Sequence, residues 1–356
     1  MLIQENIPLA PLTTLGVGGP ARYFAEAATA GQVREAVAWA AAAPLPLFVL
    51  GGGSNLLAAD AGFPGLVLKT GILGVTEQPG GQKLLFTAGA AEDWDTFVSY
   101  AVVRNCAGVE CLSGIPGTVG AAPVQNVGAY GQEVSETIFR IEVLDTVTGE
   151  TEWLDKPHCE FGYRSSIFNG RERGRYIILR VTFALTPGGP ARIAYADLKR
   201  HFGSRVPSLA ETTEAVRRIR LDKGMLLVKG AEDCRSAGSF FKNPVLNPDE
   251  YAEVERRAYE LGLSIPCYPV LASQYKIPAG WLVEQSGFHK GYRRGPAGIS
   301  PKHALALVNY GGATAADLLA LKDQIQAAVY ARFGIALQPE PVFVGFTGEG
   351  TGQSSD

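Results

Sequence analysis

The sequence predicts an α+β protein made of more than one domain. Helical and strand patterns alternate over the first hundred residues, where a helix over 29–42 leads into a buried strand over 45–50 that ends in a glycine loop. Residues 141–183 favour antiparallel strands separated by turns, and helical spacing returns after residue 209. Because 356 residues exceed one ordinary core, two or three domains are expected.

The spacing of apolar residues assigns the further elements in chain order. Residues 66–69 and 84–88 are typical of strands, and residues 93–106 resume a helical period. Apolar side chains recur at helical spacing over 315–333. The remaining expected elements are strands at 141–144, 151–154, 176–183 and 338–345 and helices at 209–221 and 248–263.

Composition favours a globular protein that works on small molecules. Hydrophobic residues make up 46% of the chain and charged residues 19%, while 43 glycines and 22 prolines indicate many loops close to something bound. The net charge of −3 and the pI near 5.9 give no basic field for nucleic acid or an anionic membrane. We therefore expect no nucleic-acid partner.

The sequence carries no pattern typical of export, membrane insertion or metal binding. Residues 1–6 lack the basic region and long apolar core of a signal peptide, and the most apolar run, 36–50, is too short for a bilayer and contains Pro44 and Pro46. The five cysteines form no C-x-x-C pair, and the four histidines lack zinc-ligand spacing. A cytoplasmic protein with reduced thiols and no structural metal is expected.

Three glycine clusters mark places where the backbone can approach a ligand. Residues 16–21 match G-x-G-x-x-A, but the strand-like residues after them argue against a dinucleotide fingerprint, which needs a helix there. Residues 51–55 follow a buried strand and can form an amide nest for a pyrophosphate, with a tight strand-exit turn as the alternative. Residues 113–122 contain three glycines spaced by three. Two such loops favour a dinucleotide bound without the Rossmann motif.

Five ordered motifs extend this observation along the chain. They are Gly-Gly-Gly-Ser-Asn (51–55), Ser-Gly-Ile-Pro-Gly-Thr-Val-Gly-Ala (113–121), Gln-Asn-Val-Gly-Ala-Tyr-Gly (125–131), Tyr-Arg-Ser-Ser (163–166) and Gly-Ser-Phe-Phe-Lys-Asn-Pro (238–244). Together they resemble the UDP-N-acetylenolpyruvoylglucosamine reductase family, from about residue 13 to 345. The resemblance implies a two-part FAD-binding domain of the vanillyl-alcohol-oxidase type and a C-terminal α/β substrate-binding domain.

The resemblance also implies domain boundaries and a reaction. FAD-binding subdomains are expected at 1–70 and 71–220, a substrate-binding domain at 221–345 and a flexible tail at 346–356. NADPH would reduce non-covalently bound FAD, and hydride would then reach C3 of UDP-N-acetylglucosamine enolpyruvate while C2 is protonated. The product, UDP-N-acetylmuramate, serves peptidoglycan synthesis. The implied FAD contacts are Gly51, Gly52, Gly53, Ser54, Asn55, Ser113, Gly114, Ile115, Pro116, Gly117, Thr118, Gly120 and Ala121.

Three residues match the family's catalytic positions. The resemblance implies that Arg164 holds the substrate carboxylate, that Ser239 protonates C2 and that Glu340 acts with the arginine at the intermediate. Without the motifs, a surface loop arginine, a turn serine and a solvated strand-edge glutamate are the simpler interpretations. The arginine that the family carries two residues after the glutamate is Val342 here, and Pro341 also departs from the commoner pattern.

Four further positions are implied to contact the substrate: Tyr195, Lys223, Asn243 and Gln285. Lys223 aligns with a lysine that meets the nucleotide diphosphate, and Asn243 and Gln285 align with polar contacts. Tyr195 fits a tyrosine loop that closes over the substrate, and a buried core tyrosine is the alternative.

Two other functions stay open at this point. An FAD oxidase with the same flavin domain would use oxygen, but such enzymes often attach the flavin to a histidine and residues 1–157 contain none. A nucleotide-sugar-binding protein that has lost its chemistry is the other alternative, and the retention of Arg164, Ser239 and Glu340 argues against it. A monomer or weak oligomer is expected.

Overall fold

The chain folds into two compact units in the computed structural model, which describes residues 1–270 and 274–346. The first unit contains residues 1–7, 21–53 and 64–222, and the second contains residues 8–20, 54–63 and those from 223 onward. Two short N-terminal segments therefore belong to the second unit. The predicted tail at 346–356 lies outside the described residues apart from Phe346, and the predicted domain boundaries stay a prediction.

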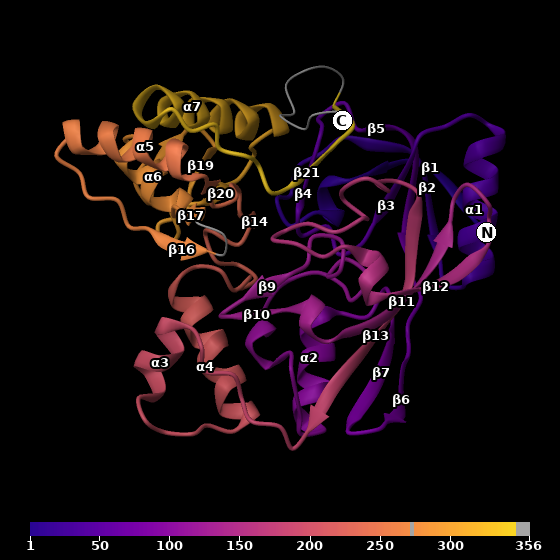
Figure 1. The fold of residues 1–356 in the computed structure, drawn as a ribbon. Coiled ribbons are helices and arrows are strands. Elements are labelled where there is room, and N and C mark those ends of the chain that lie inside the picture. Colours follow the sequence, from indigo (N-terminus) through magenta and orange to yellow (C-terminus); the bar gives the residue numbers. More distant parts are fainter. Residues whose placement is uncertain (271–273, 347–356) are drawn as a thin grey trace. The chain divides into compact units, whose positions relative to one another are not determined.

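A four-stranded sheet and one helix form the start of the first unit (Figure 1). In sheet order the strands are β1 (Ile3–Pro8), β2 (Pro20–Ala27), β5 (Phe63–Thr70) and β3 (Leu47–Leu50), and helix α1 (Ala30–Ala42) joins β2 to β3. The Gln32 amide donates to the Thr29 hydroxyl and so caps α1. The helix predicted over 29–42 is confirmed, and β2 occupies the place where a dinucleotide fingerprint would need a helix.

The second sheet of the first unit is antiparallel and packs against helix α2 (Trp94–Val103), as Figure 1 shows. In sheet order its strands are β12 (Thr151–Asp155), β11 (Ile138–Asp145), β13 (Tyr176–Pro187), β7 (Lys83–Gly89) and β6 (Val75–Gly80), with β8 (Cys106–Ala107) paired to β13. Phe97 from α2 and Phe183 from β13 are buried with ring centroids 4.7 Å apart. Each such burial stabilises the fold by roughly 1.5–3 kcal/mol. The three predicted antiparallel strands are confirmed.

Shorter elements complete the first unit. They are β9 (Gly128–Ala129), β10 (Gln132–Glu133), α3 (Ala196–Phe202), α4 (Leu209–Asp222) and the 3-10 turns η2 (Glu110–Leu112), η3 (Val134–Glu136) and η4 (Lys156–Cys159). Helix α4 confirms the helix predicted at 209–221. The two helices α3 and α4 enclose a small apolar cluster that includes Cys111, Tyr130, Leu198 and Val216.

Helices α5 (Pro248–Glu260), α6 (Ala279–Gln285) and α7 (Ala315–Phe333) pack with short strands in the second unit (Figure 1). The strands are, by sheet, β14 (Ser236–Ser239), β20 (Ala306–Asn309), β19 (Ala297–Ile299) and β18 (Arg293–Arg294); β15 (Val245–Leu246), β17 (Gln274–Lys276) and β16 (Tyr268–Val270); and the parallel pair β21 (Val342–Val344) and β4 (Leu56–Ala58), with η1 (Ala10–Leu12) as a 3-10 turn. Helix α7 has the predicted bounds, and α5 ends three residues before the predicted limit of 263.

The strand predicted at 338–345 is shorter in the structure, and its residues pair with two different segments. Residues Val342–Val344 pair with β4, whereas Pro339 forms a bridge with Phe241. Pro339 and Pro341 have no amide hydrogen, so a continuous ladder across 338–345 would lack two donors. The prolines therefore divide this segment between two partners.

An acidic cap joins the N-terminal part of the second unit to α7. The amides of Ala315 and Ala316 donate to the two carboxylate oxygens of Asp60, at 2.8 and 3.0 Å. Thr314 and Asp317 form a capping box at the same helix start. A carboxylate at this end also suits the helix dipole. Within residues 1–270 and 274–346, no helix is both long enough and apolar enough to cross a bilayer.

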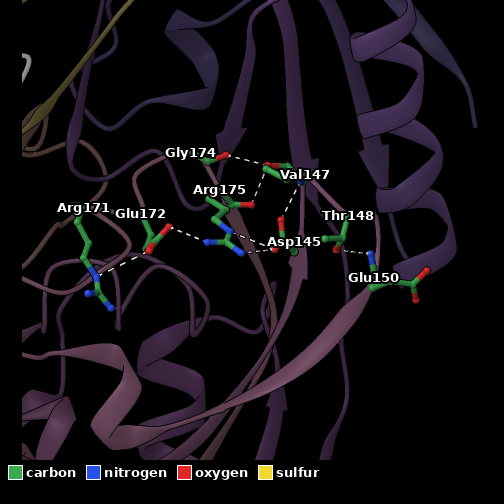
Figure 2. Close-up of polar contacts among 9 residues, drawn as sticks. Asp145, Val147, Thr148, Glu150, Arg171, Glu172, Gly174 and Arg175 are labelled. Atoms are coloured by element: carbon green, nitrogen blue, oxygen red, sulfur yellow. Dashed lines mark hydrogen bonds and ion pairs between the residues drawn. The ribbon is translucent and has the colours of Figure 1, made fainter.

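An ion-pair clasp closes the turn between β11 and β12, and Figure 2 shows its members. Arg175 donates from Nε and Nη2 to Oδ2 of Asp145, at 3.1 and 2.8 Å, and from Nη1 to Glu172 at 3.2 Å. The other carboxylate oxygen of Asp145 accepts the Val147 amide at 2.8 Å. Asp145 is 3% exposed, so its charge needs these partners. The Arg175 hydrogen bonds hold the pKa of Asp145 below its usual value.

We expect Asp145→Asn to destabilise the protein by about 1–3 kcal/mol at neutral pH, because the partly buried hydrogen bonds of Arg175 lose their charged acceptor. A lowered carboxyl pKa stabilises the fold above the unfolded-state pKa of about 3.9, and the contribution is lost as the pH falls through the folded value. The difference in melting temperature between the variant and the parent protein should therefore shrink below about pH 4. Asp155→Asn, at an exposed aspartate on β12, is the matched control. A gap that is constant down to pH 2 would contradict the clasp.

Candidate active site

The two predicted phosphate loops of the first unit lie against each other. A Cβ atom added to Gly52 would stand 2.8 Å from Cα of Gly117, and one added to Gly51 would stand 3.1 Å from Oγ1 of Thr118. Gly53 and Gly117 also have positive φ values of 65° and 131°. Glycine is therefore required here both for space and for backbone conformation.

Part of the second loop is already bonded to protein. The Val119 and Gly120 amides donate to the carbonyls of Glu92 and Ala90, both at 2.9 Å. A Cβ on Gly120 would lie 2.6 Å from Cβ of Ala90, so this glycine provides close packing and its amide is not available to a phosphate. Fewer backbone amides can therefore bind an anion than the whole 113–121 motif contains.

Thr118 supplies a polar group that fits a bound anion. Its hydroxyl oxygen is buried and has no hydrogen-bond partner among the described residues. A buried hydroxyl without a partner is costly, and it needs either a ligand or water. Its position in the loop that packs on Gly51 and Gly52 is where a pyrophosphate oxygen would be expected. The residues present thus fit the phosphate part of FAD.

Helices α2 and α4 fix the start of this loop. Asp95 accepts hydrogen bonds from the Ser113 hydroxyl at 2.9 Å and the Gly114 amide at 2.6 Å, and it pairs with Arg217. Burial acts to raise the pKa of Asp95, but the bonds from Gly114, Ser113 and Arg217 outweigh it and hold the pKa below its usual value. Asp95 thus stays charged near neutral pH. Ser113 is fully buried, and its hydrogen bond to Asp95 holds the start of the loop in place.

Arg164 lies in a strained turn held by the Gln125–Gly131 motif. Its φ is 54°, which few non-glycine residues adopt, and its Nη2 donates to the Gly128 carbonyl at 2.7 Å. The Ser166 hydroxyl donates to Val124 O at 2.6 Å, which joins the same two segments. The side chain of Arg164 is half-buried. The structure thus brings two predicted motifs together. Arg164 is a partly exposed loop residue, and its catalytic role stays a prediction.

Tyr195 stands at the N-cap position of α3 and is 44% exposed. The alternative of a buried core tyrosine is therefore wrong. Its ring meets the buried ring of Tyr130 edge-to-face, with centroids 5.3 Å apart and an interplanar angle of 81°. An exposed aromatic side chain on a supported loop can contact a ligand, as the tyrosine loop requires.

Backbone pairing in the second unit joins Glu340 to Phe240, the residue after Ser239. Ser239 ends β14, after Gly238 with φ of 73°, and the next residue, Phe240, accepts the Glu340 amide at 2.9 Å through its carbonyl. Lys242 N donates to Gln338 O at 2.9 Å in the same ladder. Phe240 is fully buried, which fixes the register of this pairing. A hydroxyl and a carboxylate predicted to act together thus come from adjacent backbone segments.

Asn55 holds the other side of Glu340. Its Nδ2 donates to the Glu340 carbonyl at 3.3 Å, and its own carbonyl accepts the Val342 amide at 3.0 Å. Ser54 O accepts a hydrogen bond from the Thr14 hydroxyl at 3.3 Å. Ser54 and Asn55 belong to the second unit, whereas Gly51–Gly53 belong to the first, so the predicted 51–55 nest spans a unit boundary. Asn55 contributes to the placement of the Glu340 backbone.

Of the remaining predicted substrate residues, Asn243 and Gln285 meet the two ends of α6, and Lys223 begins the last segment of the second unit. Asn243 Oδ1 accepts the Ala279 amide at 2.8 Å and so caps α6, which leaves its NH₂ group for a ligand. Gln285 is the last residue of α6 and is half-buried. Lys223, also half-buried, follows α4 directly.

Sequence reasoning missed several polar residues that support the site. Thr14 donates to Ser236 O at 2.6 Å, and Asn309 Nδ2 donates to Leu15 O at 3.0 Å, which anchors the N-terminal segment beside β14. In the first unit Asp95 and Arg220 were also missed. Asp95 is the second residue of α2, and an aspartate in a first helical turn gives no local sign of a distant partner, so periodicity could not have identified it.

The two glycine loops and the Thr118 hydroxyl fit a nucleotide phosphate, and comparison with known proteins gives the class of protein. Residues 21–155 match the model of an FAD binding domain. Residues 230–344 match the model for the C-terminal domain of UDP-N-acetylenolpyruvoylglucosamine reductase. The protein is thus an FAD-binding oxidoreductase.

The chain belongs to the UDP-N-acetylenolpyruvoylglucosamine reductase family. It is 46% identical to the enzyme of that name from Thermobifida fusca, over 96% of this chain and 98% of the relative. It is also 46% identical to the one from Streptomyces coelicolor, over 96% and 91%. The solved structure of the Thermus caldophilus reductase superposes with a TM-score of 0.66 at 27% identity, over 96% of this chain and all of that one. The predicted fold class and family are confirmed.

Replacing Thr118 by valine should separate cofactor binding from folding. Removal of a buried hydroxyl without a partner should leave the apoprotein unchanged or stabilise it by up to about 1 kcal/mol. Loss of one hydrogen bond to a charged phosphate should weaken FAD binding roughly 10- to 100-fold. FAD fluorescence titration and thermal melts of the apoprotein measure the two effects. Thr118→Ser keeps the hydroxyl and is the control; equal FAD affinity in both variants would remove Thr118 from the phosphate site.

Proposed function

We propose that this protein reduces UDP-N-acetylglucosamine enolpyruvate to UDP-N-acetylmuramate with electrons from NADPH. The observation that carries the proposal is the match to reductases of this family over 96% of the chain. The backbone bond from Glu340 to Phe240, the residue after Ser239, supports it. The reaction adds a hydride at C3 and a proton at C2 of the enolpyruvyl double bond, while NADPH becomes NADP⁺. When bound, FAD supplies the hydride.

Ser239 is the proposed proton donor. A free serine is a weak acid, so its hydroxyl must be held at C2 and assisted by its surroundings. Burial of Phe240 and Phe241 on its C-terminal side fixes the strand end, and the left-handed Gly238 sets the direction from which it emerges. The hydroxyl gives its proton to C2 and regains one from water or a neighbouring acid before the next turnover.

Arg164 and Glu340 are proposed to act together on the intermediate in which negative charge develops as hydride adds. A guanidinium can hold both oxygens of the substrate carboxylate and stabilise an enolate-like intermediate. The Gly128 bond and the rigid turn keep Arg164 in one arrangement, which lowers the reorganisation needed during the reaction. Glu340 is fixed through its backbone by Phe240 and Asn55. We assign it to the same intermediate.

Substrate recognition is proposed to use Tyr195, Lys223, Asn243 and Gln285. A lysine provides a point charge for the diphosphate, and the amides offer donors to polar groups of the sugar or nucleotide. NADPH and UDP-sugars are nucleotides of the cell interior, so we place the reaction in the cytoplasm. A monomer or weak oligomer remains our proposal for the assembly.

The test is an anaerobic titration that follows the visible flavin absorbance. NADPH should bleach the flavin, and addition of UDP-N-acetylglucosamine enolpyruvate should restore the colour rapidly because it accepts the electrons. Recovery with oxygen but not with the enolpyruvyl substrate would favour an oxidase. Protein that holds no flavin after reconstitution with FAD would favour a binding protein without chemistry.

Ser239→Ala should slow the second half of this titration by about 10²- to 10⁴-fold, since a positioned proton donor contributes that much. Reduction by NADPH should stay near the parental rate, because it needs no proton at C2. Stopped-flow absorbance separates the two half-reactions. Ser264→Ala, at an exposed serine of the second unit, is the matched control and should leave both rates unchanged. Equal slowing of both halves in Ser239→Ala would rule out the proton-donor role.

A further inference from the structure

We propose that Tyr130 is a positioning residue that links the FAD loop to the substrate tyrosine within the first unit. Its hydroxyl acts on Gly114 through Arg220, and its ring supports Tyr195. The inference rests on the proposed function for the identity of the substrate. The proposed effect of Tyr130 on FAD binding does not depend on that substrate. Tyr130 lies in the 125–131 motif and has no role assigned so far.

The backbone of Tyr130 indicates a constrained position. Its φ is 49°, in the left-handed region that bulky residues rarely adopt, and its side chain is 8% exposed. The ring belongs to the apolar cluster formed with Leu198 of α3 and Val216 of α4. An unusual backbone conformation is kept where surrounding contacts fix it. The conformation directs this side chain into the helix pair instead of toward solvent.

The hydroxyl of Tyr130 reaches the cofactor loop through a buried arginine. Arg220, 4% exposed, hydrogen-bonds the Tyr130 hydroxyl and donates from Nε to the Gly114 carbonyl at 3.1 Å. Asp95 binds the amide of the same Gly114. The amide and the carbonyl of Gly114 are therefore both held by charged side chains, Asp95 half-buried and Arg220 buried. Burial raises the pKa of Tyr130 to about 12, so the phenol stays neutral and accepts from the guanidinium.

The ring of Tyr130 supports the substrate tyrosine. Tyr195 packs its ring edge-to-face on it at 5.3 Å. The chain just before Tyr195 is tied to η2, because the Arg192 amide donates to Glu110 at 2.9 Å and the Cys111 thiol donates to Arg192 O at 3.2 Å. The η2 turn leads directly into Ser113 and Gly114. The tyrosine loop and the cofactor loop therefore share one support.

Two substitutions separate the two contacts. Tyr130→Phe keeps the ring and removes the Arg220 bond, so we expect the dissociation constant for FAD to rise about 5- to 20-fold while KM for the enolpyruvyl substrate stays within twofold. Tyr130→Met fills similar space without an aromatic face, so KM should also rise about tenfold with little change in kcat at saturating FAD. FAD release from the holoenzyme is followed by flavin fluorescence.

The matched control is Tyr100→Phe. The hydroxyl of Tyr100, on α2, accepts a hydrogen bond from Arg104 at 3.2 Å and donates one to Glu77 on β6. This substitution should leave FAD affinity and KM unchanged. An FAD affinity in Tyr130→Phe equal to that of the control overturns the cofactor link. A KM in Tyr130→Met equal to that in Tyr130→Phe overturns the ring link. If Tyr130→Met does not fold, the FAD affinity of Tyr130→Phe decides the proposal.

Failure of the proposed function is recognised separately. If reduced parental enzyme is not reoxidised by the enolpyruvyl substrate, the assigned reaction is wrong, but FAD release from Tyr130→Phe still reports on the Arg220 link. If the parental enzyme turns over and Tyr130→Phe releases FAD at the control rate, the reaction stands and the Tyr130 proposal is wrong.

Discussion

The ladder between residues 240–242 and 338–340 is the constraint on which the second unit's chemistry depends. Its hydrogen bonds join the residues that follow Ser239, at the end of β14, to Glu340 and the segment that leads into β21. The same segment then pairs with β4, whose preceding residue Asn55 binds Glu340 on its other side. Because Asp60 after β4 caps α7, the longest helix of the described chain stabilises the arrangement. The reactive side chains thus lie at strand ends and are supported by the core.

In the first unit, glycine serves three different physical purposes within one pair of loops. Gly52 allows two backbones to touch, Gly53 and Gly117 adopt left-handed conformations, and Gly120 packs on Ala90 while its amide bonds to protein. A phosphate nest is formed by the amides that remain after such internal bonds are made. The Thr118 hydroxyl, which has no hydrogen-bond partner among the described residues, marks a polar group that a ligand can use. Residues that shape a loop and residues that bind its ligand are therefore different members of one motif.

Long periodic elements could be predicted from the sequence, because each carries its own apolar face. Helices α1 and α7 and strands β7, β11, β12 and β13 lie where residue spacing placed them, whereas β6 and β8 of the same sheet were not predicted. Helices α3 and α6 have seven residues each, too few for a clear period, and they depend on caps and neighbours. The motifs identified the residues of the candidate site but not their support. Thr14 and Ser236 are 222 residues apart, and no local pattern encodes such a bond.

Backbone strain connects the motif residues with the chemistry proposed for them. Among the described residues, Asn126, Tyr130 and Arg164 combine positive φ with positions in the 125–131 and 163–166 motifs. Each such conformation costs about 1–3 kcal/mol and persists where the surroundings fix it. Asn126 makes hydrogen bonds to Glu133, Gly162 and Ser135, which join the two motifs in one rigid turn system. A flexible loop would avoid the strain, but it would let the Arg164 guanidinium reorganise as charge develops. The strain is therefore the cost of a preorganised site.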